Sequence, residues 1–144
     1  MKKQAYTIIA MMVLLGCIAG SAKAQCNNMP AVAKIPFQFS TGKAPLPAGE
    51  YTITCFDPNG RLVLIQNRDR SARATILMIS LKNTGRESGK LVFHRYGSRY
   101  FFAQAWDGGS TGLELPTTRA ERTVVNEVAG IKPKIEAIAL TLHR

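Results

Sequence analysis

The most distinctive chemical grouping in the sequence is an aromatic and basic segment that runs from Phe93 to Phe102. Aromatic rings interleaved with arginine can stack on sugars or bases and hold an anion. The residues that could form such a ligand surface are His94, Arg95, Tyr96, Arg99, Tyr100 and Trp106. A structural interpretation competes with this one, because antiparallel sheets use cross-strand aromatic pairs for stability. The sequence alone leaves both interpretations open.

The sequence contains no recognisable catalytic or metal-binding motif. Its two histidines are His94 and His143, and no pair of His or Cys residues has the spacing of metal ligands. Neither a G-x-S-x-G turn nor a glycine-rich phosphate loop occurs. Four acidic residues could meet as the paired carboxylates of a glycosidase, namely Glu50, Asp57, Asp107 and Glu114. Because scattered loop acids are mostly solvated, we expect a protein that is not an enzyme and has no cofactor or metal, with a carbohydrate-active enzyme as an alternative.

A β-hairpin must position the aromatic and basic segment. Glycine at the first place of the two-residue loop Gly97-Ser98 is typical of a type II′ turn, whose twist matches that of the strands. This turn places Tyr96 opposite Arg99, Arg95 opposite Tyr100, His94 opposite Phe101 and Phe93 opposite Phe102. We expect one face to enter the core with Leu91, Phe93, Tyr100, Phe102 and Trp106. The other face carries Val92, His94, Tyr96, Arg99, Phe101, Ala103 and Ala105 and is mixed in character.

The rest of the chain has the pattern of short antiparallel strands, because apolar residues recur at every second position between turn residues. The expected strands are Val32–Phe39, Glu50–Phe56, Arg61–Gln66, Ala74–Leu81 and Ile135–Leu142, besides the hairpin. The run Ala74–Leu81 is apolar on both faces, which predicts a central strand covered on both sides. The fold class is therefore mainly β: a single antiparallel β-sandwich or partly open barrel of about seven strands with one short helix.

The short helix is expected after Thr118. Thr118 and Glu121 have the spacing of a capping box, in which each side chain satisfies the backbone N–H of the other residue. The residues Ala120, Val124, Val125 and Val128 fall on one helical face, and Gly130 is a natural stop. The β-branched residues in this segment leave an extended strand as the alternative.

The N-terminus has the pattern of an export signal. Lys2 and Lys3 precede an apolar run from Ile8 to Ala19, and an A-x-A site follows at Ala22–Ala24. The run is shorter than the about 20 residues that a membrane-spanning helix needs. We expect a signal peptide over residues 1–24 and a single exported domain over residues 25–144, without a transmembrane span. Alternatively, Leu14–Cys17 resembles a lipoprotein box, in which Cys17 would be lipidated and would anchor the protein to the envelope.

The mature chain holds two cysteines, Cys26 and Cys55. An even pair in an oxidising compartment predicts a disulfide. A loop of about 30 residues closed in this way would gain roughly 3.5 kcal/mol of stability in the chain-entropy model. The alternative is a buried Cys55 with a free Cys26 on the N-terminal tail.

The charge of the chain is strongly positive, with 19 Lys and Arg residues against 9 Asp and Glu residues. An excess of this kind favours anionic partners. The basic residues are scattered over the sequence rather than clustered, and an exported protein rarely meets nucleic acid. We therefore expect a solvated basic surface or contact with an anionic polysaccharide or another envelope component, and we do not expect nucleic acid as a partner.

Several stretches resemble an uncharacterised family of small exported proteins of soil bacteria. They are Ile35–Phe39 with Leu46–Ile53, then Leu91–Phe102, then Gly112–Glu121. The chain departs from the family pattern at Gln38, where members have an acidic residue, and at Thr117 and Thr118, where they have lysine and serine. The resemblance implies export and one β-rich domain, and it transfers no catalytic residue.

Together these features predict an exported, non-enzymatic β-domain that is a binding or structural component of the periplasm or cell exterior. A different class of function is a surface assembly subunit. In that case Ala74–Leu81 or the final strand would pair between chains by strand addition.

Overall fold

The computed structural model describes residues 30–57, 60–82, 85 and 88–142. The predicted signal peptide over residues 1–24, the candidate lipidation site Cys17, Cys26 and His143 lie outside the described residues. No helix in the described ranges is both long and apolar enough to cross a bilayer.

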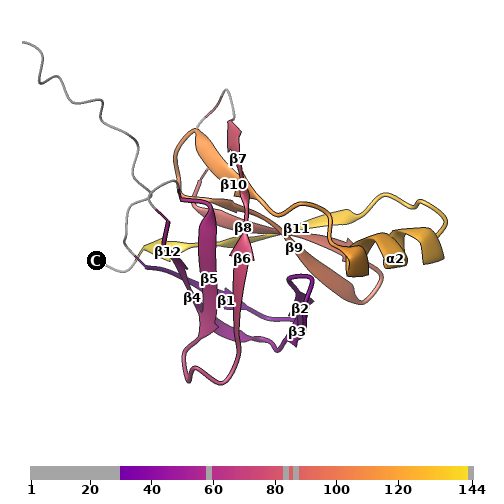
Figure 1. Ribbon diagram of the computed structural model, residues 1–144, viewed down its shortest axis with the longest axis horizontal. Helices are drawn as coiled ribbons and strands as arrows, with labels where there is room; N and C mark the ends of the chain where they lie inside the picture. Colours follow the sequence, from indigo (N-terminus) through magenta and orange to yellow (C-terminus); the bar gives the residue numbers. More distant parts are fainter. Residues whose placement is uncertain (1–29, 58–59, 83–84, 86–87, 143–144) are drawn as a thin grey trace, which may run out of the picture.

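The first sheet has five antiparallel strands in the order β12-β1-β4-β5-β6 (Figure 1). These strands are β12 (Thr141–Leu142), β1 (Ala31–Ile35), β4 (Gly49–Cys55), β5 (Leu62–Asn67) and β6 (Arg73–Leu77). One face of the sheet is buried, because every second side chain along β1, β4 and β5 is apolar and points inward. On β4, Tyr51 and Ile53 are buried while Glu50 is exposed.

The second sheet contains the hairpin and has the order β11-β8-β9-β10-β7. Its strands are β11 (Lys134–Ala139), β8 (Lys90–Tyr96), β9 (Arg99–Trp106), β10 (Thr111–Glu114) and β7 (Ile79–Lys82). Two short strands, β2 (Phe39–Ser40) and β3 (Pro45–Leu46), pair with each other, and β2 also runs parallel to β9.

The two sheets form a sandwich and do not close into a barrel. The chain passes directly from one sheet to the other at two places, from β6 to β7 across Met78 and from β11 to β12 across Leu140. The core between the sheets contains Tyr51, Phe39, Phe93, Phe102, Ile35, Ile65, Met78, Leu91 and Val63, each less than 2 % exposed. The predicted sandwich with one short helix is confirmed, and the strands are more numerous because several predicted strands are split.

The predicted central strand Ala74–Leu81 is wrong. This run is split at Met78 into β6 and β7, and each half forms the edge of a different sheet. Ile76 and Met78 are buried, whereas Leu77 is 65 % and Ile79 is 50 % exposed. The outer face of this run carries apolar residues that are exposed to solvent, and no second layer covers them among the described residues.

The hairpin register is confirmed over its last four residue pairs, from Phe93 and Phe102 to Tyr96 and Arg99. Further from the turn, Val92 pairs with Gln104 and Ala103 is the extra residue of a β-bulge. A bulge reverses the alternation of side chains beyond it.

The bulge corrects two predicted positions on β9. Ala105 lies on the core side, although the register predicted it on the mixed face. Trp106, predicted in the core, lies on the opposite face, where its indole N–H donates to Gln104 Oε1 at 3.1 Å. The hairpin core is therefore made by Leu91, Phe93, Tyr100 and Phe102 without Trp106.

The predicted helix is present as α2 (Arg119–Glu127). Thr118 is its N-cap, and its hydroxyl accepts a hydrogen bond from the backbone N–H of Glu121 at 3.2 Å. The second half of the capping box is not formed, because the Glu121 carboxylate bonds to the hairpin. The buried residues of α2 are Glu121 and Val124, while Ala120 is exposed. The apolar face predicted from Ala120 is thus rotated toward Glu121.

The C-terminal end of α2 has a Schellman motif. The N–H of Gly130 donates to the carbonyl of Val125 at 3.0 Å, and the N–H of Ala129 donates to the carbonyl of Asn126 at 3.3 Å. Gly130, the predicted stop residue, has a φ of 75°, but the residue directly after the C-cap Val128 is Ala129, with a φ of 53°. A residue with a Cβ therefore occupies the left-handed position that glycine normally takes.

Candidate functional site

The predicted ligand-surface residues are divided between the two faces of the hairpin. Arg95 and Tyr100 lie on the inner side, where the Tyr100 ring stacks on Phe37 with a centroid distance of 3.8 Å. The Arg95 guanidinium lies 5.4 Å from the centroid of the Tyr100 ring. Tyr100 is therefore partly buried and packs at the margin of the core.

Arg99 is directed toward α2 rather than into a shared surface. Its Nη1 atom lies 2.8 Å from Glu127 Oε2, and both side chains are more than half exposed. Trp106 is the last residue of β9, at the opposite end of the strand from the turn, and it is buried against Gly112 on β10. The predicted residues therefore do not form one surface, and Trp106 in particular lies apart from the others.

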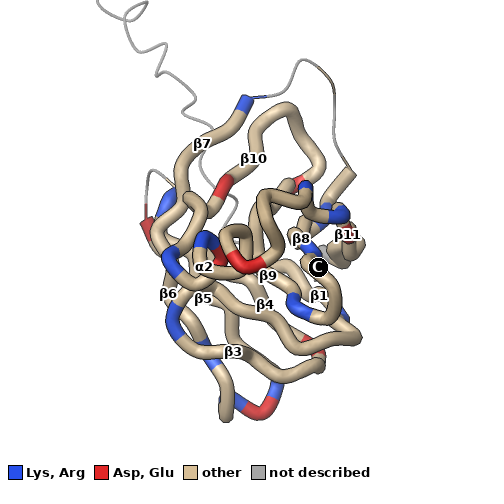
Figure 2. Tube along the Cα trace, turned by 90° about the vertical axis from the view of Figure 1, so that its right-hand side faces the viewer, with Lys and Arg blue, Asp and Glu red and all other residues tan. Residues whose placement is uncertain are grey.

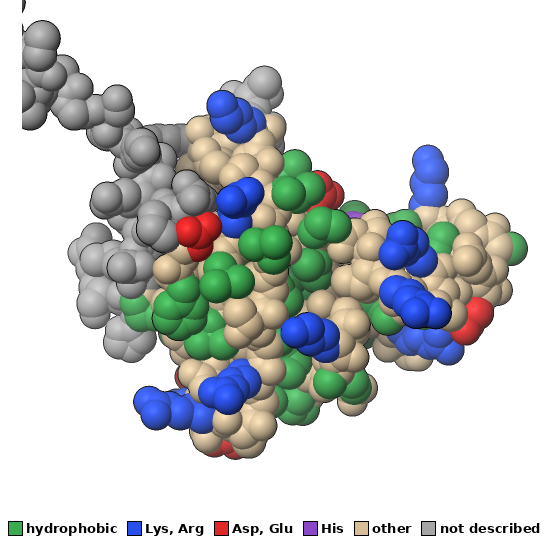
Figure 3. Space-filling model, in the orientation of Figure 1, with side chains coloured by type: hydrophobic (Ala, Val, Ile, Leu, Met, Phe, Trp, Pro, Cys, Tyr) green, Lys and Arg blue, Asp and Glu red, His purple; other side chains and the backbone are tan. Residues whose placement is uncertain are grey.

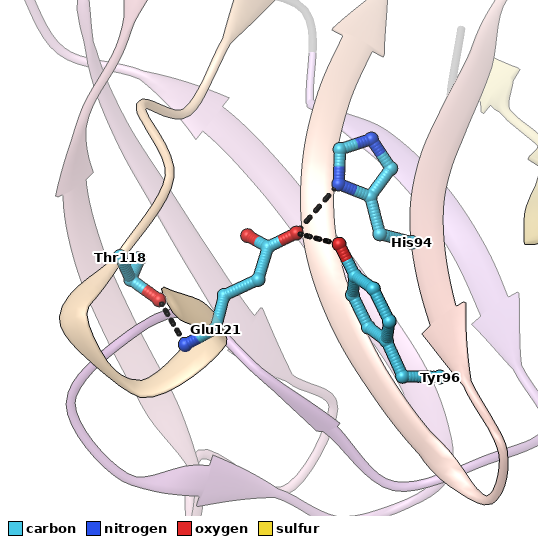
Figure 4. Close-up of polar contacts among 4 residues, drawn as sticks. All are labelled: His94, Tyr96, Thr118 and Glu121. Carbon is cyan, nitrogen blue, oxygen red and sulfur yellow. Dashed lines mark hydrogen bonds and ion pairs between the residues drawn. The ribbon is translucent and has the colours of Figure 1, made fainter. Parts of the chain in front are cut away.

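The outer face of the hairpin carries a polar cluster that includes two predicted residues and one that was missed (Figure 4). The His94 Nδ1 atom lies 2.7 Å from Glu121 Oε1. The Tyr96 hydroxyl donates to the same oxygen at 3.2 Å. Glu121 is only 4 % exposed, and its backbone N–H is held by Thr118. This cluster, which we call the Glu121 triad (His94, Tyr96 and Glu121), fastens α2 to the hairpin.

Burial of a carboxylate is unfavourable unless hydrogen-bond donors or positive charge compensate it. Here Nδ1 of His94 and the hydroxyl of Tyr96 both contact one carboxylate oxygen, and Nδ1 donates to it in the tautomer that carries its proton on that nitrogen. The pKa of Tyr96 is raised above its usual value, first because the ring is partly buried and second because the negative charge of Glu121 disfavours phenolate. The triad is therefore most favourable with Tyr96 neutral.

A carboxylate that orients an imidazole is also found in hydrolases and at metal sites, where the second ring nitrogen acts on a substrate or metal. In this structure the His94 side chain is 27 % exposed. No described residue forms a hydrogen bond with its Nε2 atom, and the described ranges contain no group of three or more His, Cys, Asp or Glu residues placed to hold a metal. The contacts of the Glu121 carboxylate join α2 to the hairpin.

Glu121 was missed as a site residue because the capping-box spacing gave its carboxylate a local role. A weak signal was present: His94 and Tyr96 lie two positions apart and therefore point to the same face of β8. Nothing in the sequence says that the helix crosses this face, so the partner could not be chosen.

A pocket of about 380 Å³ lies between the hairpin tip and the chain that connects α2 to β11. Its wall is almost entirely apolar, and it is formed by Tyr96, Gly97, Val128 and Ile131 with the aliphatic parts of Arg95, Lys132 and Lys134. Figure 3 shows Lys and Arg side chains gathered at the end of the molecule where α2 and the hairpin tip lie. We call this feature the tip pocket.

The cations of the tip pocket are only partly compensated. Arg95 pairs with Glu136 at 3.2 Å and donates from Nε to the carbonyl of Gly97 at 2.8 Å. Lys134 lies directly opposite Arg95 in the β8–β11 ladder. Neither Lys132 nor Lys134 has an acidic partner among the described residues. Elsewhere the basic residues are distributed over the described chain (Figure 2), as their scatter in the sequence predicts.

The four acids of the glycosidase alternative lie on different elements. Glu50 is on β4 in the first sheet, 3.6 Å from Arg68, whereas Glu114 is on β10 in the second sheet. The Asp107 carboxylate accepts a hydrogen bond from the N–H of Gly109 within its own turn, at 2.9 Å. The backbone carbonyl of Asp57 accepts a hydrogen bond from the N–H of Gly60 at 2.7 Å, within the turn that follows β4. The described contacts thus give the Asp107 carboxylate a turn contact and the Glu50 carboxylate a surface ion pair.

Cys55 lies on β4 and packs, half-buried, against the core. Its predicted partner Cys26 is outside the described residues, so the disulfide stays a prediction.

No protein-family model, curated protein or solved structure matches the chain. The resemblance to exported proteins of soil bacteria therefore stays a prediction, and the function must be argued from the site.

Proposed function

We propose that this protein is an exported, non-enzymatic β-domain that binds an anionic ligand of the cell envelope or exterior. The observation that carries the proposal is the tip pocket, an apolar hollow whose lining residues include three cations, Arg95, Lys132 and Lys134. Pockets with an apolar lining and a few convergent polar groups are typical ligand sites. The net charge of the chain and the predicted export signal both favour an anionic partner outside the cytosol.

The test is a binding screen with the purified mature chain against anionic and neutral ligands at low and high salt. The screen contains a glycan array and a set of small anions. We expect anions alone to bind, and we expect the affinity to fall as salt rises, because the cations lie at the surface. Arg95→Ala and Lys134→Gln should weaken binding, whereas Lys82→Gln, on the distant strand β7, should not. Binding that ignores Arg95→Ala and Lys134→Gln would refute the choice of surface.

The export part of the proposal is tested by the mass of the mature protein. A chain that begins at Gln25 and lacks two hydrogens would support release together with a bond between Cys26 and Cys55. A mass increased by acyl chains would instead support a lipid anchor at Cys17. Recovery of the full-length chain with reduced thiols from the cytosol would exclude both forms of export.

A second candidate function, an assembly subunit, is favoured by the sheet edges. The two segments expected to pair between chains are both edge segments: β6 and β7 end the two sheets on one side, and β12 and β11 end them on the other. Leu62 pairs with Leu77 at the β6 edge, and both are exposed. Figure 3 shows hydrophobic side chains gathered over this part of the surface. Edge strands of this kind can pair with another chain.

Light scattering coupled to size-exclusion chromatography separates the two candidates. An assembly subunit should gain mass with concentration and lose this tendency in the variant Leu77→Lys. A strictly monomeric protein at high concentration would end the assembly hypothesis and would leave the binding domain untouched.

A further inference from the structure

We infer that the tip pocket binds a single-chain anionic amphiphile, with an acidic head group held by Arg95, Lys132 and Lys134 and an alkyl chain laid against Tyr96, Val128 and Ile131. The inference rests on the proposed function, from which it takes the preference for an anion. It goes further in choosing an amphiphile over a polysaccharide.

The walls of the pocket favour an alkyl chain. Ile131 is 67 % exposed and lies beside the half-buried Val128 and the ring of Tyr96. The lining contains no Asn, Gln, Ser, Thr, Asp or Glu, which are the neutral and acidic side chains that hydrogen bond to sugar hydroxyls. A volume of about 380 Å³ is at the small end of the range of ligand pockets, about 300–1,000 Å³, and suits a short chain.

The cross-strand pair of Arg95 and Lys134 indicates where the head group would lie. Like charges directly opposite each other in an antiparallel ladder are destabilising. Here Glu136 pairs with Arg95 but not with Lys134, and Lys132 adds another positive charge at the rim of the pocket. An anionic head group between these cations would form charge-assisted hydrogen bonds and remove the repulsion.

The hairpin and the helix both contribute to the pocket, and the Glu121 triad relates them. Tyr96 lines the pocket and also donates to Glu121, so its ring is held by a contact on its far end. The opposite wall, Val128 and Ile131, follows directly from the end of α2. Since the triad fastens α2 to β8, both walls are placed before a ligand arrives, which lowers the entropic cost of binding.

The test is calorimetric titration of the full mature chain with sodium alkanoates from hexanoate to dodecanoate, each below its micelle concentration. We expect the dissociation constant to fall about two- to fourfold for each added CH₂ until the pocket is filled. Decyltrimethylammonium, which has the same chain and the opposite charge, should not bind. An affinity that is independent of chain length would overturn the inference.

Two exposed positions separate the head-group and chain contributions. Lys134→Gln should weaken decanoate binding about tenfold and should raise the Tm of the free protein, because the repulsion with Arg95 is removed. Ile131→Ser should make the dissociation constant depend less on the length of the alkanoate chain and should leave its dependence on salt unchanged. Lys82→Gln should change neither property. Equal decanoate affinity in wild type and Lys134→Gln would overturn the assignment of the head-group site.

Parallel experiments distinguish a membrane-borne amphiphile from a free one, and they also distinguish failure of this inference from failure of the proposed function. Vesicles that contain an anionic phospholipid test a membrane-borne ligand, and monomeric decanoate tests a free one. Binding to either that is lost in both Lys134→Gln and Ile131→Ser supports the pocket. Vesicle binding that is unchanged in Ile131→Ser would be explained by surface charge alone and would overturn the inference. Binding of anionic glycans without any alkanoate or vesicle binding overturns the inference but preserves the proposed function, and failure of every anion overturns both.

Discussion

The substitution Glu121→Gln tests whether the Glu121 triad fastens the helix to the hairpin. The change keeps the size of the side chain and the Thr118 cap but removes the charge of the acceptor. Hydrogen bonds to charged groups contribute about 1.5–3 kcal/mol and neutral ones about 0.5–1.5 kcal/mol, so each of the two bonds should lose about 1 kcal/mol. The bond from His94 is short, at 2.7 Å, and burial strengthens its electrostatic part. We therefore expect a total loss of about 2–3 kcal/mol.

The assay is urea denaturation of the mature domain at neutral pH, supported by calorimetry. For a domain of this size 1 kcal/mol corresponds to about 4 °C in Tm, so the expected decrease is about 8–12 °C. Glu127→Gln is the matched control, because it makes the same change on the same helix at an exposed ion pair. Glu127 lies 2.8 Å from Arg99 and its side chain is 52 % exposed, so its loss should stay below about 0.5 kcal/mol.

A double-mutant cycle distinguishes the triad from a general effect on the helix. Tyr96→Phe should cost about 1.5–3 kcal/mol when Glu121 is present and only about 0.5–1.5 kcal/mol in the Glu121→Gln background, which is a coupling of about 1 kcal/mol. Equal losses in Glu121→Gln and Glu127→Gln, or strict additivity with Tyr96→Phe, would refute the reasoning that the buried carboxylate holds the two elements together.

Three further predictions concern a glycine, a helix end and a tyrosine. A Cβ at residue 112 would lie 2.6 Å from Cε3 of the buried Trp106 ring, so Gly112→Ala should cost about 1–3 kcal/mol and change the tryptophan fluorescence; an unchanged spectrum would contradict the contact. Ala129 has a left-handed φ of 53°, so Ala129→Gly should stabilise the domain by about 0.5–1 kcal/mol in urea denaturation, and a loss of stability would show that this backbone is not strained. The pKa of Tyr96 is raised above 10.0, so the folded state holds this proton more tightly than the unfolded state. The stabilisation by neutral Tyr96 is complete at neutral pH and is lost as the pH rises above 10. The variant Tyr96→Phe lacks this group, so its free energy of unfolding should fall less than that of the wild type between neutral and strongly alkaline pH.

The hairpin could be predicted because its determinants are local. A two-residue turn that begins with Gly97 fixes the pairing of the residues beside it, and the last four pairs follow from the turn alone. The bulge at Ala103 lies further along the strand, where nothing in the residue types marks it. The prediction therefore placed Trp106 on the wrong face of β9, because one extra residue exchanges the two faces of a strand.

The edge strand β6–β7 could not be predicted for a different reason. The pattern of Ala74–Leu81 records which residues are apolar, and it does not record whether a second layer covers the outer side. Leu77 and Ile79 are exposed because the chain leaves one sheet at Met78 and joins the edge of the other. Whether another chain covers this edge is the question that the light-scattering experiment addresses.

Glu121 shows how a local motif and a tertiary contact compete for one side chain. A reciprocal cap would give its carboxylate a single backbone donor at the helix start. The hairpin offers two side-chain donors, and burial strengthens both. Thr118 still forms its own half of the cap, so the helix begins where the sequence places it even though the carboxylate turns elsewhere. The hydrogen-bond partner of Tyr96 lies 25 positions away in the chain, and one wall of the tip pocket is therefore held by a residue that does not line it.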